Sequence, residues 1–376
     1  MSRAKSSARS RFTGAALLLA LLIFLVPAVR SGDSRLYLLA VLIPCVMLLC
    51  GTVVARIFSL DRLLLMLSLF LCMTGIAALA LSDPESALFR ASCCGAGIIL
   101  LIIGAVLIRS LSGSVLTALV SGFLGLLLLI SKLLSPSLDL PVTFPALAFL
   151  LLAFAALLSR EGPISAAVLG ITVTALLLLR NDAADAVLWG VTILLLLFAA
   201  DGRLFIVLPV MVSLLLLYYG AFFLLPQASL SWSTATPEIL VSAGLFGTDT
   251  LPENYAAASA CLFPLLSGHY GLFFAGLSVL MFLPFTLRGT TVASCARTRF
   301  HAVLAMGISL LLALYTLSSL LFEFGFLPFA GSGVPLLTRS LPALGSQLFL
   351  IGMLCGISGR NDADLAEDAH LAMLAK

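Results

Sequence analysis

Residues 59–110 read SLDRLLLMLSLFLCMTGIAALALSDPESALFRASCCGAGIILLIIGAVLIRS. Two long apolar runs flank a short acidic turn around Asp83 and Glu85, and the first run, Leu63–Ser82, contains no charged residue. A run of about 20 apolar residues crosses the ~30 Å hydrocarbon layer of a bilayer as an α-helix. This stretch therefore predicts a transmembrane helical hairpin.

The composition of the whole chain agrees with that prediction. Of its 376 residues, 62% are hydrophobic and 10% are charged, and the mean hydropathy is +1.22. A typical soluble domain is about half apolar and about a quarter charged. These values exclude a soluble enzyme, a secreted disulfide scaffold and a disordered chain, and a net charge of +3 is too small to indicate a nucleic-acid partner.

Apolar runs between charged or Gly/Pro-rich breaks predict an all-α, polytopic membrane protein with about twelve transmembrane helices. The predicted spans are 13–29, 36–55, 63–82, 91–108, 114–131, 143–158, 163–179, 185–200, 203–225, 262–285, 300–322 and 340–358. The first span follows basic residues, as a signal peptide does, but it ends at Pro27-Ala28-Val29-Arg30 without a clear small-x-small cleavage site. We interpret it as a retained helix.

Twelve spans place both termini on the same side of the membrane. Lys and Arg in short loops concentrate on the cytoplasmic side, and cytoplasmic termini put most of the 20 Lys and Arg residues inside. The basic residues left outside are Arg30, Arg35, Arg90, Lys132, Arg180 and Arg339. We therefore expect both termini to be cytoplasmic.

The longest predicted loop, 226–261, lies outside in this orientation. It contains Glu238, Asp249 and Glu253 but no Lys or Arg. Long loops in compact proteins are often functional, so we expect a functional site to involve this loop. The polar segment 361–376 is predicted to be a solvated cytoplasmic tail. The cysteines lie mostly in apolar runs, and no Cys/His pattern has metal-ligand spacing, so we expect no metal and no cofactor.

Four stretches taken together resemble one protein family. AGLFGTDTLPENY at Ala243–Tyr255 is similar to a Gly-rich stretch followed by Leu-Pro-Glu, and FGFLPFAGSGVPLLTRS at Phe324–Ser340 is similar to a Gly/Pro-rich segment before a last helix. GMLCGISGR at Gly352–Arg360 is similar to the end of that last helix. With the hairpin at 59–110, these stretches resemble the FtsW/RodA/SpoVE (SEDS) family of bacterial cell-shape, division and sporulation proteins.

The resemblance implies a domain organisation. Residues 59–360 form a ten-helix core, with the large outer loop 226–261 between its seventh and eighth helices. Residues 1–58 form a basic segment with two additional transmembrane helices, and 361–376 form the tail. The implied location is the bacterial plasma membrane.

The resemblance also implies a chemistry. Members of the family polymerise peptidoglycan from a lipid-linked precursor and work beside a penicillin-binding transpeptidase, which makes the precursor and the transpeptidase the implied partners. Polymerisation needs a carboxylate base, and in the family this is an Asp shortly after Leu-Pro-Glu. The matching position here is Ala257 or Ala260, and no Asp or Glu occurs between Glu253 and Glu323. The sequence therefore predicts a degenerate active site.

Two other family motifs are altered. TFPAL at Thr143–Leu147 stands where the family has Gln-Pro-Ser-Glu, so that Leu147 replaces the Glu. RNDAADA at Arg180–Ala186 stands where the family has Gln-Pro-Asp-x-Gly-Thr, and it retains Asp182. Asp182 is either a surviving polar group of a central cavity or a helix-start carboxylate that stabilises the helix dipole.

A few other residues remain candidates for the site. Pro252 and Glu253 survive from Leu-Pro-Glu, where Glu253 positions the loop or serves as a weak substitute for the base. Asp249 is a second weak substitute, although GTDT is typical of a turn. Arg339, which follows Pro335, binds the phosphate of an anionic lipid or extends along the membrane interface to water.

Three functions remain open. The first is a divergent family member in cell-wall assembly, serving cell shape, division or sporulation, that lacks polymerase activity. The second is an active glycosyltransferase with a relocated carboxylate. The third is a transporter of lipid-linked precursor, for which ionisable residues near the middle of the spans are expected but almost absent.

Overall fold

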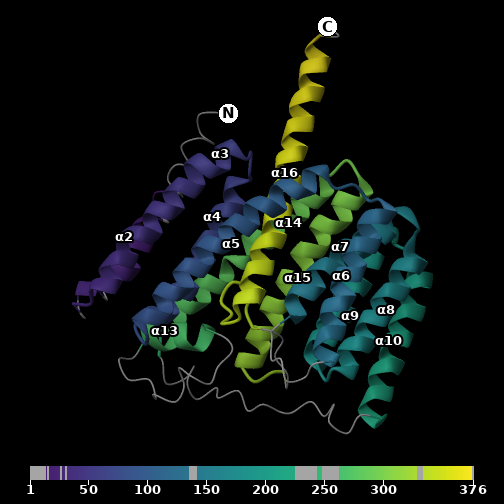
Figure 1. The fold of residues 1–376 in the computed structure, drawn as a ribbon, viewed down its shortest axis with the longest axis horizontal. Helices are drawn as coiled ribbons and strands as arrows, with labels where there is room; N and C mark the ends of the chain where they lie inside the picture. The colour runs from purple at the N-terminus through teal and green to yellow at the C-terminus, as the bar shows by residue number, and fades with distance from the viewer. Residues whose placement is uncertain are drawn as a thin grey trace.

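The computed structural model describes residues 14, 17–25, 28–29, 32–134, 142–224, 244–247, 262–327 and 333–374. Within these residues, ten helices are long and apolar enough to cross a membrane, and α8, with 17 residues, is a shorter apolar helix. The helices stand side by side in one bundle (Figure 1). The protein is an all-α, polytopic membrane protein, as its sequence predicts.

The helices follow the predicted spans in order. They are α2 (Ser34–Leu49), the π-helical turn η1 (Cys50–Val54), α3 (Ala55–Ile57), α4 (Arg62–Ala80), α5 (Pro84–Ser110), α6 (Val115–Leu134), α7 (Thr143–Arg160), α8 (Pro163–Leu179), α9 (Ala183–Asp201), α10 (Leu204–Leu224), α13 (Phe263–Leu280), α14 (Phe282–Ser294), α15 (Arg299–Glu323) and α16 (Leu341–Leu374). α2, η1 and α3 form one span, as do α13 and α14. Of the first predicted span, residues 17–25 and 28–29 are described, and they are helical.

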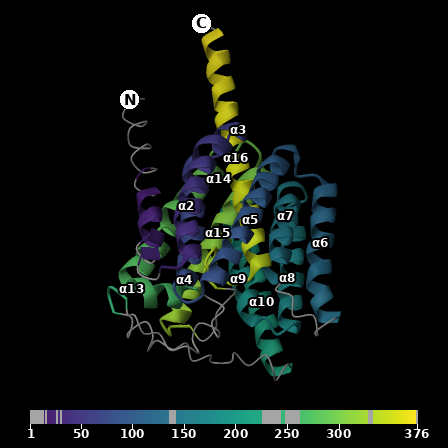
Figure 2. The same cartoon turned by 60° about the vertical axis from the view of Figure 1, so that its left-hand side comes forward.

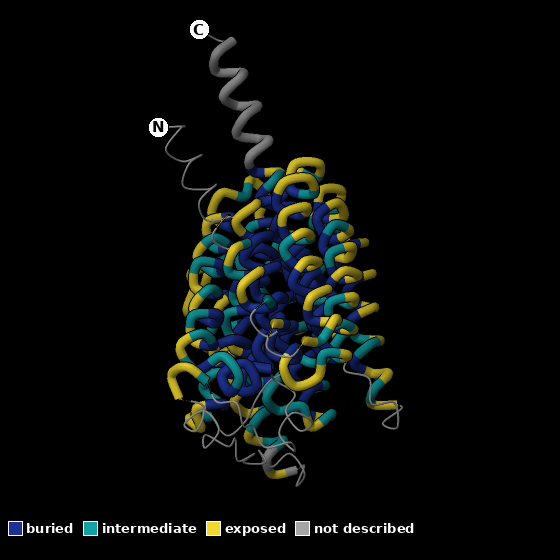
Figure 3. Tube along the Cα trace, turned by 90° about the vertical axis from the view of Figure 1, so that its left-hand side faces the viewer, coloured by how far each residue is buried: buried dark blue, intermediate teal, exposed yellow. Residues whose placement is uncertain are grey.

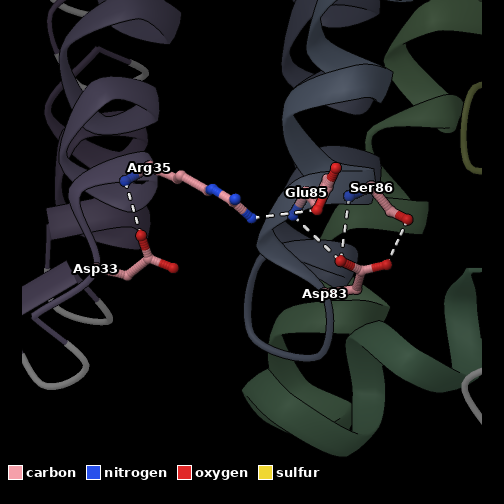
Figure 4. A network of polar contacts seen from close by, with 5 residues as sticks. All are labelled: Asp33, Arg35, Asp83, Glu85 and Ser86. Carbon is pink, nitrogen blue, oxygen red and sulfur yellow. Dashed lines mark hydrogen bonds and ion pairs between the residues drawn. The ribbon is translucent and has the colours of Figure 1, made fainter.

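The start of α5 corrects the sequence prediction. The predicted span begins at residue 91, whereas the helix begins at Pro84. Asp83 caps it by accepting hydrogen bonds from the backbone nitrogens of Glu85 and Ser86 at 3.1 and 3.2 Å, and proline suits the first helical position (Figure 4). Arg90, which the sequence analysis assigned to an outer loop, therefore lies inside a helix and is buried.

α4 is the central helix of the bundle. Its membrane-spanning window is 94% buried, compared with 28% for α6 and 17% for α10. Figure 3 shows the buried residues in the interior and the exposed residues around the outside. Many exposed side chains are Leu, Val, Ile or Phe, which is the surface that a lipid-facing helix bundle requires.

α5 and α16 pack in close contact because α16 carries two glycines at the interface. A Cβ atom on Gly352 would lie 2.0 Å from the carbonyl oxygen of Leu101, and one on Gly356 would lie 2.5 Å from that of Ala105. A small-xxx-small pattern allows such close approach of helix backbones. Here the Gly352–Gly356 pattern serves packing within the chain.

A buried carboxylate joins α4, α14 and α16 at the end where α4 begins. Asp61 accepts hydrogen bonds from Arg288 Nε at 2.7 Å and from the hydroxyl of Ser358 at 3.0 Å. From this level α16 continues without a break to Leu374 and extends beyond the bundle (Figures 1 and 2). The segment predicted as a tail is thus continuous with the last transmembrane helix.

Among the described residues, two polar contacts link the N-terminal helices to the core. Arg35 Nη1, beside the start of α2, lies 3.4 Å from Glu85 Oε2 on α5 (Figure 4), and both side chains are at least half exposed. Exposed ion pairs contribute little to stability. Tyr270 on α13 also donates a hydrogen bond to the carbonyl oxygen of Ile23 at 3.3 Å.

Candidate functional site

A polar cluster lies where α7, α8 and α9 meet. Arg180, directly after α8, and Asp182, directly before α9, form an ion pair with Nη2 and Oδ2 at 2.8 Å. The hydroxyl of Thr143, at the start of α7, accepts a hydrogen bond from Arg180 Nη2 at 3.0 Å. Asp182 occupies the N-cap position of α9 but makes no capping hydrogen bond with its side chain. Its carboxylate is therefore engaged in the cluster rather than in capping.

A second carboxylate extends this cluster toward α15. Asp185, in the first turn of α9, accepts a hydrogen bond at 2.9 Å from the hydroxyl of Tyr315, which is fully buried. The Tyr315 ring contacts Phe144 of α7 edge-on, with ring centroids 5.2 Å apart. The sequence does not single out Asp185, because its partner lies 130 residues away.

Arg180 is a buried cation with donors that have no partner in the cluster. Its side chain is only 3% exposed, and its Nε and Nη1 atoms have no hydrogen-bond partner. Leaving buried donors unsatisfied costs free energy, and a guanidinium group binds carboxylate or phosphate oxygens well. The cluster is therefore suited to an anionic group or an ordered water at Arg180.

Arg90 organises a second buried site, in the segment before α16. Arg90 Nη1 donates to the carbonyl oxygen of Thr338 at 2.5 Å, and Nη2 donates to that of Leu336 at 2.8 Å. The backbone nitrogen of Leu336 donates to Gln347 Oε1 at 2.7 Å. Non-helical backbone inside a membrane protein must have its polar groups satisfied by protein or water. Arg90 and Gln347 meet this requirement for the carbonyl oxygens of Leu336 and Thr338 and for the backbone nitrogen of Leu336.

The packing around Arg90 is tight. Leu336 adopts a positive φ of 63°, which is unusual for a leucine. A Cβ atom on Gly75 of α4 would lie 2.8 Å from Arg90 Nη2 and 3.0 Å from the Leu336 carbonyl oxygen. The absence of a side chain at Gly75 therefore lets Arg90 and the non-helical segment 333–340 pack against α4.

α13 is broken at Gly271, which corrects the predicted continuous span 262–285. Gly271 has φ 87° and ψ 157°, a conformation that favours glycine. The helix restarts at Leu272, where the backbone nitrogens of Leu272 and Phe273 donate to the carbonyl oxygens of Gly244 and Leu245 at 3.1 and 3.3 Å. The first N–H groups of any helix lack partners within it. Residues 244–247 of the large loop thus supply partners for the restarted helix.

The residues predicted for the site are placed as follows. Asp249, Pro252, Glu253, Ala257 and Ala260 lie outside the described residues. Their proposed roles stay predictions.

The remaining candidates are described. Pro335 is buried in the Arg90-bound segment, and Arg339 is partly buried at its end. Leu147, where the family has a Glu, is fully buried in the apolar core. The roles of Arg90 and Gln347 were not predicted from the sequence. Asp83-Pro84 is a helix-start signal that could have placed Arg90 inside a helix. Nothing in the sequence links Arg90 or Gln347 to Leu336.

Comparison with known proteins identifies the fold. No protein-family model and no curated protein sequence matches the chain. A chain from a peptidoglycan synthase complex that coordinates polymerization and crosslinking matches with a TM-score of 0.60 and 19% identity, over 81% of this chain and 98% of that one. The rod shape determining protein RodA of Thermus thermophilus matches with a TM-score of 0.52 and 19% identity, over 80% of this chain and 97% of RodA.

The chain therefore has the RodA fold. An aspartate-to-alanine variant of the same RodA matches with a TM-score of 0.54.

Proposed function

We propose that this protein is a SEDS-like component of bacterial cell-wall assembly that binds but does not polymerise lipid-linked peptidoglycan precursor. One combination carries the proposal, namely a RodA fold over 80% of the chain together with the absence of Asp and Glu between Glu253 and Glu323. The proposed location is the plasma membrane, with both termini cytoplasmic and the Arg180 cluster facing outward. The proposed partner is a penicillin-binding transpeptidase.

The loss of polymerase activity follows from the chemistry of glycosyl transfer. A sugar hydroxyl is a poor nucleophile, and a positioned base contributes a factor of about 10²–10⁴ to such a step. Alanine at 257 or 260 cannot accept a proton. We propose that the family activity is absent for this reason.

The two carboxylates of the Arg180 cluster already have side-chain partners. Asp182 is paired with Arg180 at 2.8 Å, and Asp185 is bonded to the Tyr315 hydroxyl at 2.9 Å. Glu253 and Asp249 remain the carboxylates to test.

Precursor binding is supported by the two unpartnered donors of buried Arg180. A phosphate oxygen of a lipid-linked precursor suits a guanidinium that already holds one carboxylate. Replacing Arg180 by leucine should weaken binding, whereas replacing exposed Arg35 should leave it unchanged.

The experiment supplies purified protein with lipid-linked precursor, with and without a transpeptidase, and measures both binding and glycan polymer. We expect binding without polymer. Polymer that disappears in Glu253→Ala or Asp249→Ala would favour the relocated-base enzyme, and polymer that survives both changes would place the site elsewhere. Ala260→Asp and Ala257→Asp test whether a restored carboxylate returns activity.

The proposed orientation has its own test. A reporter fused after Lys376 and another inserted near Ser233 should report opposite sides of the membrane, the first cytoplasmic and the second external. Reporters on the same side would contradict the twelve-span topology.

A further inference from the structure

Residues 244–247, here called the loop tip, have a fixed backbone. The carbonyl oxygens of Gly244 and Leu245 accept hydrogen bonds from the first two backbone nitrogens after the break at Gly271. The loop tip is thereby attached to the restarted end of α13.

The side chains of the loop tip are apolar and exposed. Leu245 is 64% exposed and Phe246 is 87% exposed. Two adjacent apolar side chains held open to solvent by a fixed backbone are unusual unless they contact a partner or a membrane.

The loop tip lies beside a stripe of exposed apolar side chains on the neighbouring span. Phe273, whose backbone nitrogen is bonded to Leu245, is exposed, and further exposed side chains follow at helical spacing along α13 and α14, namely Leu280, Leu283 and Leu287. Spacing of three, four and seven residues places them on one face of the helix. Neither 244–247 nor 272–287 contains a charged residue.

We propose that Leu245 and Phe246 insert into the bilayer interface beside α13 and anchor the large loop to the membrane. A lipid surface suits this tip better than water, because aromatic and aliphatic side chains at the end of a span partition into the interface. The backbone supports the same conclusion, since the N–H groups of Leu272 and Phe273 have protein partners, as N–H groups at membrane depth require. The anchor fixes the loop shortly before Leu251-Pro252-Glu253.

The test places a photoreactive p-benzoylphenylalanine at Phe246 in the full chain, reconstituted in phosphatidylglycerol/phosphatidylethanolamine nanodiscs. Phe246 is almost fully exposed, so the change disturbs no packing. As a positive control, p-benzoylphenylalanine replaces Phe273, which lies on the span and is 68% exposed. As a negative control, it replaces Glu85, whose side chain is 80% exposed. Intact mass spectrometry after illumination measures phospholipid adducts.

We expect lipid adducts at 246 comparable with those at 273 and about ten-fold above those at 85, a ratio that burial of one phenylalanine side chain supports. Adducts at 273 without adducts at 246 would overturn the proposal. A protein crosslink in place of lipid at 246 would also overturn it, as would equal yields at 246 and 85 or the absence of lipid adducts at 273.

Discussion

Replacing Arg90 by methionine should destabilise the protein strongly. Methionine keeps a side chain of similar length but lacks the guanidinium donors that bind the buried carbonyl oxygens of Leu336 and Thr338. Hydrogen bonds from charged groups contribute about 1.5–3 kcal/mol each, so the two bonds predict a loss of about 3 kcal/mol or more. The carbonyl oxygens are left without partners in a region that helices enclose.

Thermal unfolding of the purified protein in lipid nanodiscs measures this loss. Arg35→Met is the matched control, because Arg35 forms an exposed ion pair and its loss should change stability by less than about 1 kcal/mol. Gly75→Ala should also destabilise, since the new methyl group would lie 2.8 Å from Arg90 Nη2. A melting temperature for Arg90→Met equal to that of Arg35→Met would refute the assignment of Arg90 as the group that holds residues 333–340.

The same assay tests three smaller predictions. Tyr315→Phe should cost about 1.5–3 kcal/mol by removing one hydrogen bond to a carboxylate, and an unchanged melt would mean that this bond is not formed. Hydrogen bonds from Ser86 hold the pKa of Asp83 below its ordinary value. Its contribution is therefore present above about pH 4 and lost as pH falls through the lower folded-state pKa, so Ser86→Ala should reduce the acid sensitivity of the melt. Gly352→Val should cost about 3 kcal/mol by forcing α16 from α5, whereas Gly276→Val, with no atom within 4 Å of its Cβ, should be nearly neutral.

The length of apolar runs predicted the helices well because the bilayer sets their minimum length. It predicted their ends poorly where polar residues continue a helix. Arg90 and Glu85 suggested a loop, yet the Asp83 cap and Pro84 start the helix before them. The break at Gly271 was also missed, because an apolar run reads the same whether its helix is straight or broken.

The partners of the buried polar groups could not be predicted. Arg90 and Leu336 are 246 residues apart, and Asp61 and Ser358 are 297 residues apart. Only the packing of α4, α5 and α16 brings them together. The ion pair between Asp182 and Arg180 could not be predicted either, because it depends on the turn between α8 and α9, where Asn181 adopts a φ of 64°.

The proposal of binding without polymerisation agrees with the residues at the altered motif positions. Leu147 stands where the family has a glutamate and is fully buried, so a carboxylate at that position would need a partner to offset its desolvation. Leucine removes this requirement and adds to the core. Arg180 and Asp182 form an ion pair, and two nitrogen donors of Arg180 have no hydrogen-bond partner. A cluster with spare donors and no free described carboxylate is suited to hold an anion. It is poorly suited to take a proton from an attacking hydroxyl, which is the reason we expect binding to persist where polymer synthesis does not.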